Sequence, residues 1–250
     1  MTSQVEGRQA VRELLRARMR RVQRIIVAEG AGEKGALSEI LDLAGAAGVP
    51  SKRVSREQLE AAALTDAPQG VIAWAESLPD LELADLTRAG KPFLVVLDGV
   101  TDPRNLGAVM RSALCAGATG LVLGRHRAAG LTPAAVKSAA GAAEHLPVAV
   151  VGGIPAALSA LSAAGIWTVG LDADAKATLW DLRVATEPVA LVLGAEGSGL
   201  GRLTRQRCDT VVSVPLAGPL ESLNVSAAAT LACFEVARRR TMPAEGLAKD

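Results

Sequence analysis

From residue 93 onward the sequence alternates short apolar runs with helical segments, and this alternation restricts the fold more than any other feature. The apolar runs, rich in valine and leucine, lie at 93–100, 120–124, 147–151, 165–171, 189–194 and 210–215. Strands that are buried on both faces have this continuous apolar character, and parallel strands need long crossovers that are usually helical. The sequence therefore predicts an α/β fold with a parallel sheet covered by helices on both faces.

The first part of the chain predicts a smaller α/β unit of its own. Helices are expected at 6–20, 35–48 and 55–64 and strands at 21–30 and 69–76, and residues 49–54 belong to the same unit. Two prolines and several acidic residues at 77–92 indicate a linker. The expected organisation is a domain at 1–76, a linker at 77–92 and a larger domain at 93–250.

One uncharged stretch, residues 146–171, is long enough to cross a bilayer. Prolines and glycines interrupt it, so we interpret it as a strand, a helix and a strand of the sheet. The charged N-terminus does not resemble a signal peptide. Three widely spaced cysteines are typical of reduced thiols, and the two histidines form no cluster with them. A cytoplasmic protein without a metal is therefore expected.

Charge and aromatic content bear on nucleic-acid binding. The net charge is only +1, but residues 1–24 hold seven arginines against Glu6 and Glu13, and Arg238–Arg240 form a second cluster. Such clusters bind phosphates or simply form a solvated helix face, and the sequence leaves both interpretations open. Because aromatic residues make up only 2% of the chain, stacking of bases on an aromatic platform is not expected as the main binding mode.

Three loops follow predicted strands, at 97–117, 191–201 and 214–230. Open parallel sheets bind ligands at the carboxyl ends of their strands, so these loops are expected to meet at one edge. The glycine-rich loop 191–201 matches neither a Walker loop nor the dinucleotide-binding fingerprint, and by itself it indicates only a tight turn.

Helix starts are expected in the other two loops. In the first loop, Asp102 caps a helix that has Pro103 as its first residue, or Asn105 caps a helix that starts later. In the last loop, residues 221–240 are expected to form one long helix. Its first turn contains Ser222, Asn224 and Ser226, which are more polar groups than capping needs.

Together these segments resemble the SpoU/TrmH family of RNA ribose 2′-O-methyltransferases. The resemblance rests on Asn105 followed six residues later by Arg111, on "LVLGAEGSGL" at 191–200, and on "VPLAGPLESLNVSAAAT" at 214–230. It covers roughly 93–240. The segment "VEGRQAVRELLRA" is similar to the L30e-like, RNA-substrate-binding domain of the RlmB-like branch. The resemblance implies S-adenosylmethionine as cofactor, a trefoil knot in the C-terminal domain and a homodimer formed through that domain.

The resemblance also implies roles for individual residues. Catalytic roles fall to Arg111, Asn105, Glu196, Ser222 and Asn224. Cofactor contacts fall to Gly194, Gly199, Val214, Leu223 and Ser226, several of them through the main chain. We assign RNA contacts to Arg8, Arg12, Arg16 and Arg104. The family assigns removal of the 2′-hydroxyl proton to Arg111, but arginine stays protonated near neutral pH, so orientation of the substrate phosphate remains an alternative.

The RlmB-like branch implies methylation of a guanosine in the peptidyl-transferase region of 23S rRNA. The alternatives are methylation of tRNA, methylation of another rRNA site of the antibiotic-resistance type, or an RNA-binding assembly protein without catalysis. A nicotinamide-dependent enzyme is disfavoured, because no early dinucleotide-binding fingerprint is present.

Overall fold

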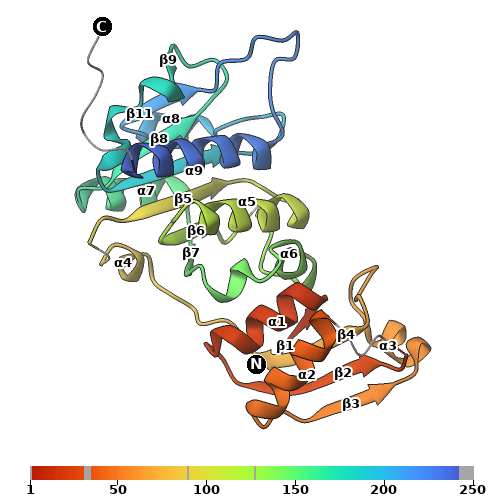
Figure 1. Cartoon of the computed structure of the whole chain (residues 1–250). Helices are drawn as coiled ribbons and strands as arrows, with labels where there is room; N and C mark the ends of the chain where they lie inside the picture. The colour runs from red at the N-terminus through yellow and green to blue at the C-terminus, as the bar shows by residue number, and fades with distance from the viewer. Residues whose placement is uncertain (1, 31–34, 89, 127, 242–250) are drawn as a thin grey trace, which may run out of the picture. The chain divides into compact units, whose positions relative to one another are not determined.

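The computed structural model of the chain describes residues 2–30, 35–88, 90–126 and 128–241 (Figure 1). Its contacts divide the chain into two compact units that are each discontinuous in sequence. The first unit comprises residues 1–79, 103–111 and 129–145, and the second comprises 80–102, 112–128 and 146–250. The domain boundaries expected at residues 76 and 92 stay a prediction.

The first unit contains a four-stranded sheet in the order β1-β4-β2-β3. Strand β4 pairs antiparallel with β1 and β2, and β2 pairs parallel with β3. The strands are β1 (Thr2–Glu6), β2 (Val22–Ala28), β3 (Ser51–Val54) and β4 (Val71–Glu76), and the helices of its N-terminal part are α1 (Arg8–Ala17), α2 (Ala36–Ala46) and α3 (Arg56–Ala62).

Strand β1 was not predicted. The helix expected over 6–20 begins only at Arg8, because Gly7 takes a left-handed φ of 93° that separates it from β1. Helix α1 buries Val11, Leu14 and Leu15 at helical spacing, as its sequence pattern indicates.

The second unit contains a seven-stranded parallel sheet in the order β7-β6-β5-β10-β8-β11-β9. Its strands are β5 (Phe93–Asp98), β6 (Gly120–Gly124), β7 (Val148–Val151), β8 (Trp167–Leu171), β9 (Ala177–Thr178), β10 (Val189–Gly194) and β11 (Thr210–Ser213). Every residue of β10 is buried, so both of its faces are covered. The predicted parallel α/β sheet is confirmed; the short strand β9 was not predicted.

The remaining helices connect these strands along the chain. They are α4 (Leu83–Leu86), α5 (Pro103–Cys115), α6 (Pro133–Ser138), α7 (Ile154–Ala163), α8 (Arg202–Arg207) and α9 (Val225–Thr241), with 3₁₀ turns at Ala142–Glu144, Leu179–Asp181 and Arg183–Thr186. Helix α7 packs Leu158 and Leu161 into a core cluster with strand residues such as Val96 and Val192. Helix α4 lies within residues 77–92, the segment expected as a linker.

The uncharged stretch 146–171 forms β7, α7 and β8, as predicted. Across the described part of the chain, no helix has the length and apolarity needed to cross a membrane. Helix α5 begins at Pro103, which agrees with a start after Asp102 and excludes the later start capped by Asn105.

The expectation of a helix from residue 221 was wrong, because α9 begins at Val225. Asn224 ends the preceding loop: its side-chain oxygen accepts the Ser226 N–H at 2.9 Å, and its carbonyl accepts the Ala228 N–H at 3.0 Å. This is the geometry of an N-cap. Residues 222–224 therefore belong to the loop before the helix, with Ser222 and Leu223 outside it.

Candidate functional site

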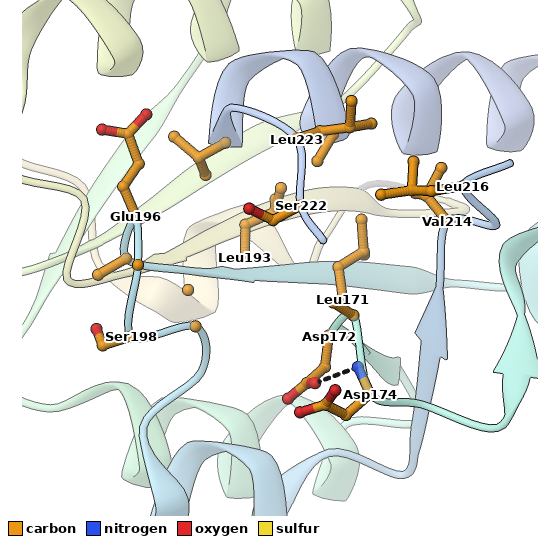
Figure 2. A pocket seen from close by; sticks show the side chains of 17 residues that line it. Leu171, Asp172, Asp174, Leu193, Glu196, Ser198, Val214, Leu216, Ser222 and Leu223 are labelled. Carbon is orange, nitrogen blue, oxygen red and sulfur yellow. Dashed lines mark hydrogen bonds between the residues drawn. The ribbon is translucent and has the colours of Figure 1, made fainter. Parts of the chain in front are cut away.

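A cavity of about 290 Å³ opens at the carboxyl ends of β8, β10 and β11 in the second unit (Figure 2). Its lining comes from three loops that are far apart in sequence. The lining residues are Leu171–Asp174 at the end of β8 and after it, Leu193–Gly199 at the end of β10, Val214, Leu216, Ser222 and Leu223 between β11 and α9, and Val225 and Ala228 in the first turn of α9. The parallel sheet thus places these loops at one edge. Two of them, 191–201 and 214–230, were expected there, whereas loop 97–117 contributes no residue to the lining.

The glycine-rich loop is a tight hairpin at the end of β10. The Ala195 N–H donates to the Gly199 carbonyl at 3.0 Å, and the Gly199 N–H donates to the Ala195 carbonyl at 2.9 Å. A Cβ added at Gly194 would lie 2.1 Å from backbone atoms of Gly199. Gly197 and Gly199 have φ values of 80° and 63°, which favour glycine. The residues of this hairpin, 195–199, line the edge of the cavity.

Glu196 and Asn224 are joined across this edge. The Asn224 Nδ2 donates to the Glu196 Oε1 at 2.6 Å, and both side chains are exposed. Because the same Asn224 also caps α9, one residue fixes the start of the helix and the orientation of the Glu196 carboxylate.

The cavity combines apolar and acidic groups. Figure 2 shows Val214 and Leu216 at one side of the view, Glu196 at the opposite side, and Asp172 with Asp174 below. The Asp172 Oδ1 accepts the Asp174 N–H at 3.0 Å, and the other Asp172 oxygen pairs with Arg205. The site therefore offers an apolar wall, a glycine-rich hairpin and acceptor oxygens.

Most of the residues predicted for this edge lie together. Six of them line the cavity: Gly194, Glu196, Gly199, Val214, Ser222 and Leu223. Asn224 reaches the cavity through Glu196. Ser226, predicted to bind cofactor, lies outside the lining; its Oγ donates to the Asn224 Oδ1 at 2.6 Å and so belongs to the cap.

Asn105 and Arg111 lie on α5, in the part of that helix that belongs to the first unit. Asn105 is 8% exposed, whereas Arg111 is exposed. The main chain at Arg104 is held by α6, because the Ser138 Oγ donates to the Arg104 carbonyl at 3.0 Å. The beginning of α5 is thus packed closely on α6, where a Cβ at Gly107 would lie 2.4 Å from that of Ser138.

The arginine clusters are partly neutralised by folding. Arg12 and Arg16 pair with Glu13 and with Glu39 of α2. The Arg8 Nε donates to the Gln69 carbonyl at 3.0 Å. The excess of positive charge counted over residues 1–24 is therefore larger than the unpaired positive charge that these residues present in the folded chain.

The C-terminal arginines are engaged as well. Arg238 and Arg239 both bind the Glu235 carboxylate. Arg240 donates to main-chain carbonyls, among them those of Ala185 at 3.0 Å and Glu187 at 2.6 Å. This cluster fixes the end of α9 within the second unit.

Sequence reasoning missed the loop after β8. Leu171, Asp172 and Asp174 line the cavity, and strand 165–171 was itself predicted. The rule that ligands bind at the carboxyl ends of parallel strands would have found them, because the sequence "DAD" at 172–174 directly follows such a strand. Among the residues described, no three His, Cys, Asp or Glu side chains form a group that could hold a metal ion.

Two sequence families match the chain. The SpoU rRNA Methylase family matches residues 92–234, and the family of RNA 2′-O ribose methyltransferase substrate-binding domains matches residues 4–81. The chain is 39% identical over 245 residues to the 23S rRNA (guanosine-2′-O-)-methyltransferase RlmB of Haemophilus influenzae, covering 96% of this chain and 99% of that one. It is 43% identical over 209 residues to the RlmB of Ralstonia nicotianae, covering 82% and 84% of the two chains.

Solved structures of SpoU methyltransferases are also similar to this chain. The SpoU methyltransferase AviRb from Streptomyces viridochromogenes, solved in complex with the cofactor AdoMet, superposes with a TM-score of 0.80 at 27% identity, covering 96% of this chain and 90% of that one. The fold, the convergent loops and matches over nearly the whole chain lead to one conclusion: this chain belongs to the SpoU rRNA methylase family.

Proposed function

We propose that the chain transfers a methyl group from S-adenosylmethionine to the ribose 2′-hydroxyl of a guanosine in 23S rRNA. The observation that carries the proposal is the convergence of residues from 171 to 228 on one cavity at the carboxyl edge of the sheet. The RlmB relatives, which are named for this reaction, match almost the full chain.

The cavity suits the cofactor chemically. Leu171, Val214 and Leu223 give an apolar wall for an adenine ring, and Gly194 and Gly199 line the cavity beside them. Carboxylates at the edge are acceptors for hydroxyl and ammonium groups. A volume of about 290 Å³ is near the lower end of the range for small-molecule sites. When bound, S-adenosylmethionine supplies an electrophilic methyl group on a sulfonium centre.

The chain's own residues then position the acceptor. The Asn224–Glu196 hydrogen bond holds a carboxylate in one orientation at the edge of the cavity. Arg111 is an exposed cation on α5, suited to holding a substrate phosphate and lowering the cost of hydroxyl ionisation through its charge. Transfer requires near-attack alignment of the two reacting atoms at about 3 Å, so orientation is a large part of this work.

The test is methyl transfer from labelled S-adenosylmethionine to rRNA isolated from a strain in which the gene is deleted. We expect incorporation into 23S rRNA, mapped to a guanosine 2′-oxygen, and no incorporation into tRNA. Arg111→Ala should lower kcat at least 100-fold while S-adenosylmethionine still binds. Near-normal turnover of this variant at saturating RNA would contradict the proposed role of Arg111. Incorporation of label into tRNA alone would contradict 23S rRNA as the substrate.

The domain roles and assembly belong to the same proposal. Residues 1–76 would bind the RNA, 77–92 would link the domains, and 93–250 would hold the methyltransferase and its trefoil knot.

The chain would act in the cytoplasm as a homodimer formed through its C-terminal domain. In support, Leu231 and Phe234 are 42% and 46% exposed and lie three residues apart on one face of α9, and adjoining exposed apolar side chains are typical of an interaction surface. Light scattering on Leu231→Ser/Phe234→Ser should show monomers.

A further inference from the structure

A second cavity, of about 450 Å³, lies in the first unit, within the match to the substrate-binding family. Its base is apolar, with Ala28, Leu59 and Pro68 buried. Its rim is polar and carries Arg8, Arg56, Glu29, Glu60, Asp66 and Gln69. Buried apolar residues combined with both donors and acceptors suit a heterocycle with hydrogen-bonding edges.

The loop before β4 is held in an unfavourable conformation at this rim. The Val71 N–H donates to the Pro68 carbonyl at 3.3 Å, and both central residues of this turn have positive φ, 57° for Gln69 and 78° for Gly70. Glycine and asparagine are the usual residues at such positions. A glutamine there costs energy, and strain of this kind is commonly retained where a side chain has a function.

The side chain of Gln69 is also oriented. Its Oε1 accepts the Arg8 N–H at 3.0 Å, and its main-chain carbonyl accepts the Arg8 Nε at 3.0 Å. These two bonds fix the glutamine amide and the guanidinium beside each other. With Oε1 engaged, the amide presents its N–H₂ group as donor, and Arg8 presents its two terminal nitrogens.

The acidic groups of the rim exclude an isolated phosphate as the natural occupant. Three carboxylates outnumber two guanidinium groups, and the Arg56 Nε already binds the Glu60 Oε1 at 2.8 Å. Asp66 has no hydrogen-bond or ion-pair partner among the described residues. A ligand that donates to Asp66 and accepts from Arg8 or Gln69 fits better than an anion.

We infer that this cavity binds an unpaired guanine of the substrate RNA. Guanine carries two adjacent N–H donors, N1 and N2, that a single carboxylate accepts together, and its O6 and N7 accept a pair of bonds from arginine. Adenine and cytosine offer one amino group and no second adjacent donor. Unpaired RNA bases are read along these edges. The inference rests on the proposed function and specifies how its RNA is recognised.

The test uses the full chain and fluorescent single-stranded RNA hexamers, UUUGUU and the same sequence with adenine, cytosine or inosine in place of guanine. Binding is measured by anisotropy at one fixed salt concentration, since RNA affinity depends strongly on salt. We expect guanine to bind about tenfold more tightly than adenine or cytosine. Inosine, which lacks the N2 amino group, should lose most of that preference.

The decisive variant is Asp66→Asn, with Glu57→Gln as its matched control, because Glu57 is an exposed residue of α3 outside the cavity. Both remove one negative charge, which by general electrostatics tightens RNA binding. The inference predicts the opposite for Asp66→Asn with the guanine hexamer, a loss of about tenfold, while Glu57→Gln keeps the preference. Equal binding of all four hexamers by the unmodified chain, or unchanged guanine binding by Asp66→Asn, would overturn it.

Methyl transfer to 23S rRNA is assayed in parallel. Transfer without guanine preference would remove this inference and leave the proposed function standing. Guanine preference without transfer to any RNA would remove the proposed function and leave the base-binding cavity.

Discussion

At the scale of single residues, the site depends on backbone geometry as much as on functional groups. Gly194 ends a strand where the chain returns so closely that no side chain fits beside Gly199. Glu196 and Asn224 were both predicted from their motifs, but their 2.6 Å hydrogen bond is a fact of the structure. Ser226 shows the limit of residue-by-residue reasoning, because it lies in a motif and serves the helix cap.

Gly194→Ala should impair the cofactor site. Its Cβ would lie 2.1 Å from the Gly199 backbone, so the hairpin must shift. Overpacking of this kind costs about 1–3 kcal/mol. We expect a lower Tm and at least tenfold weaker S-adenosylmethionine binding by calorimetry. Gly218→Ala, in the last loop but with nothing within 4 Å of the new Cβ, is the control and should bind normally. Unchanged binding by Gly194→Ala would show that the hairpin does not shape the site.

At the scale of elements, the start of α9 is where structure and site share one residue. The helix begins at Val225, and Asn224 provides both the cap and the contact to Glu196. This explains the three polar residues around the helix start. Asn224 caps the helix, Ser222 lines the cavity, and Ser226 completes the cap. The far end is fixed by Glu235, whose pKa is lowered by hydrogen bonds from Arg238 and Arg239.

Substitutions of Asn224 should separate these two functions. Asn224→Ala removes the cap and should cost about 1 kcal/mol of stability as well as activity. Asn224→Ser keeps an N-capping oxygen but cannot reach Glu196 as the amide does. We expect near-normal denaturant midpoints for the serine variant together with reduced kcat. If serine restored both stability and kcat, the contact to Glu196 would have no part in turnover.

At the scale of the whole molecule, folding brings together segments that the sequence keeps apart. The first unit includes residues 129–145, and in it Arg20 binds Glu144 through bonds of 2.9 and 2.5 Å with both side chains almost fully buried. Removing one partner of such a pair leaves a buried charge without compensation. Tertiary burial also decides the chemistry of the three cysteines.

The thiols should differ sharply in reactivity. Burial raises the pKa of Cys208 to about 12 and that of Cys233 to about 12, whereas Cys115 is exposed. At pH 8 the two buried thiols hold almost no thiolate, which is the reactive form. A disulfide reagent should therefore titrate one thiol per native chain rapidly and three after denaturation. Cys115→Ser should abolish the rapid phase, and a remaining rapid phase would contradict this assignment.

The sequence by itself determined the parallel α/β sheet, most strand positions and two of the three loops that line the cavity, 191–201 and 214–230. Apolar runs such as 93–98 and 189–194 have a local pattern that permits few other folds, and the rule for strand ends places their loops. Strand β1, the start of α9 and the role of the acidic loop after β8 were not predicted from the sequence. Short or polar segments take their structure from partners far away in the chain.

Only the tertiary structure decided which charges remain available and which groups meet. Local sequence gave no sign that Glu39 would neutralise Arg16 or that Glu144 would bury Arg20. Nor did it reveal that Gln69 would adopt a left-handed conformation beside Arg8 and Asp66 to form a second cavity. The physical reason is range: periodicity and capping act over a few residues, whereas ion pairing, burial and cavity formation depend on contacts that exist only after the chain has folded.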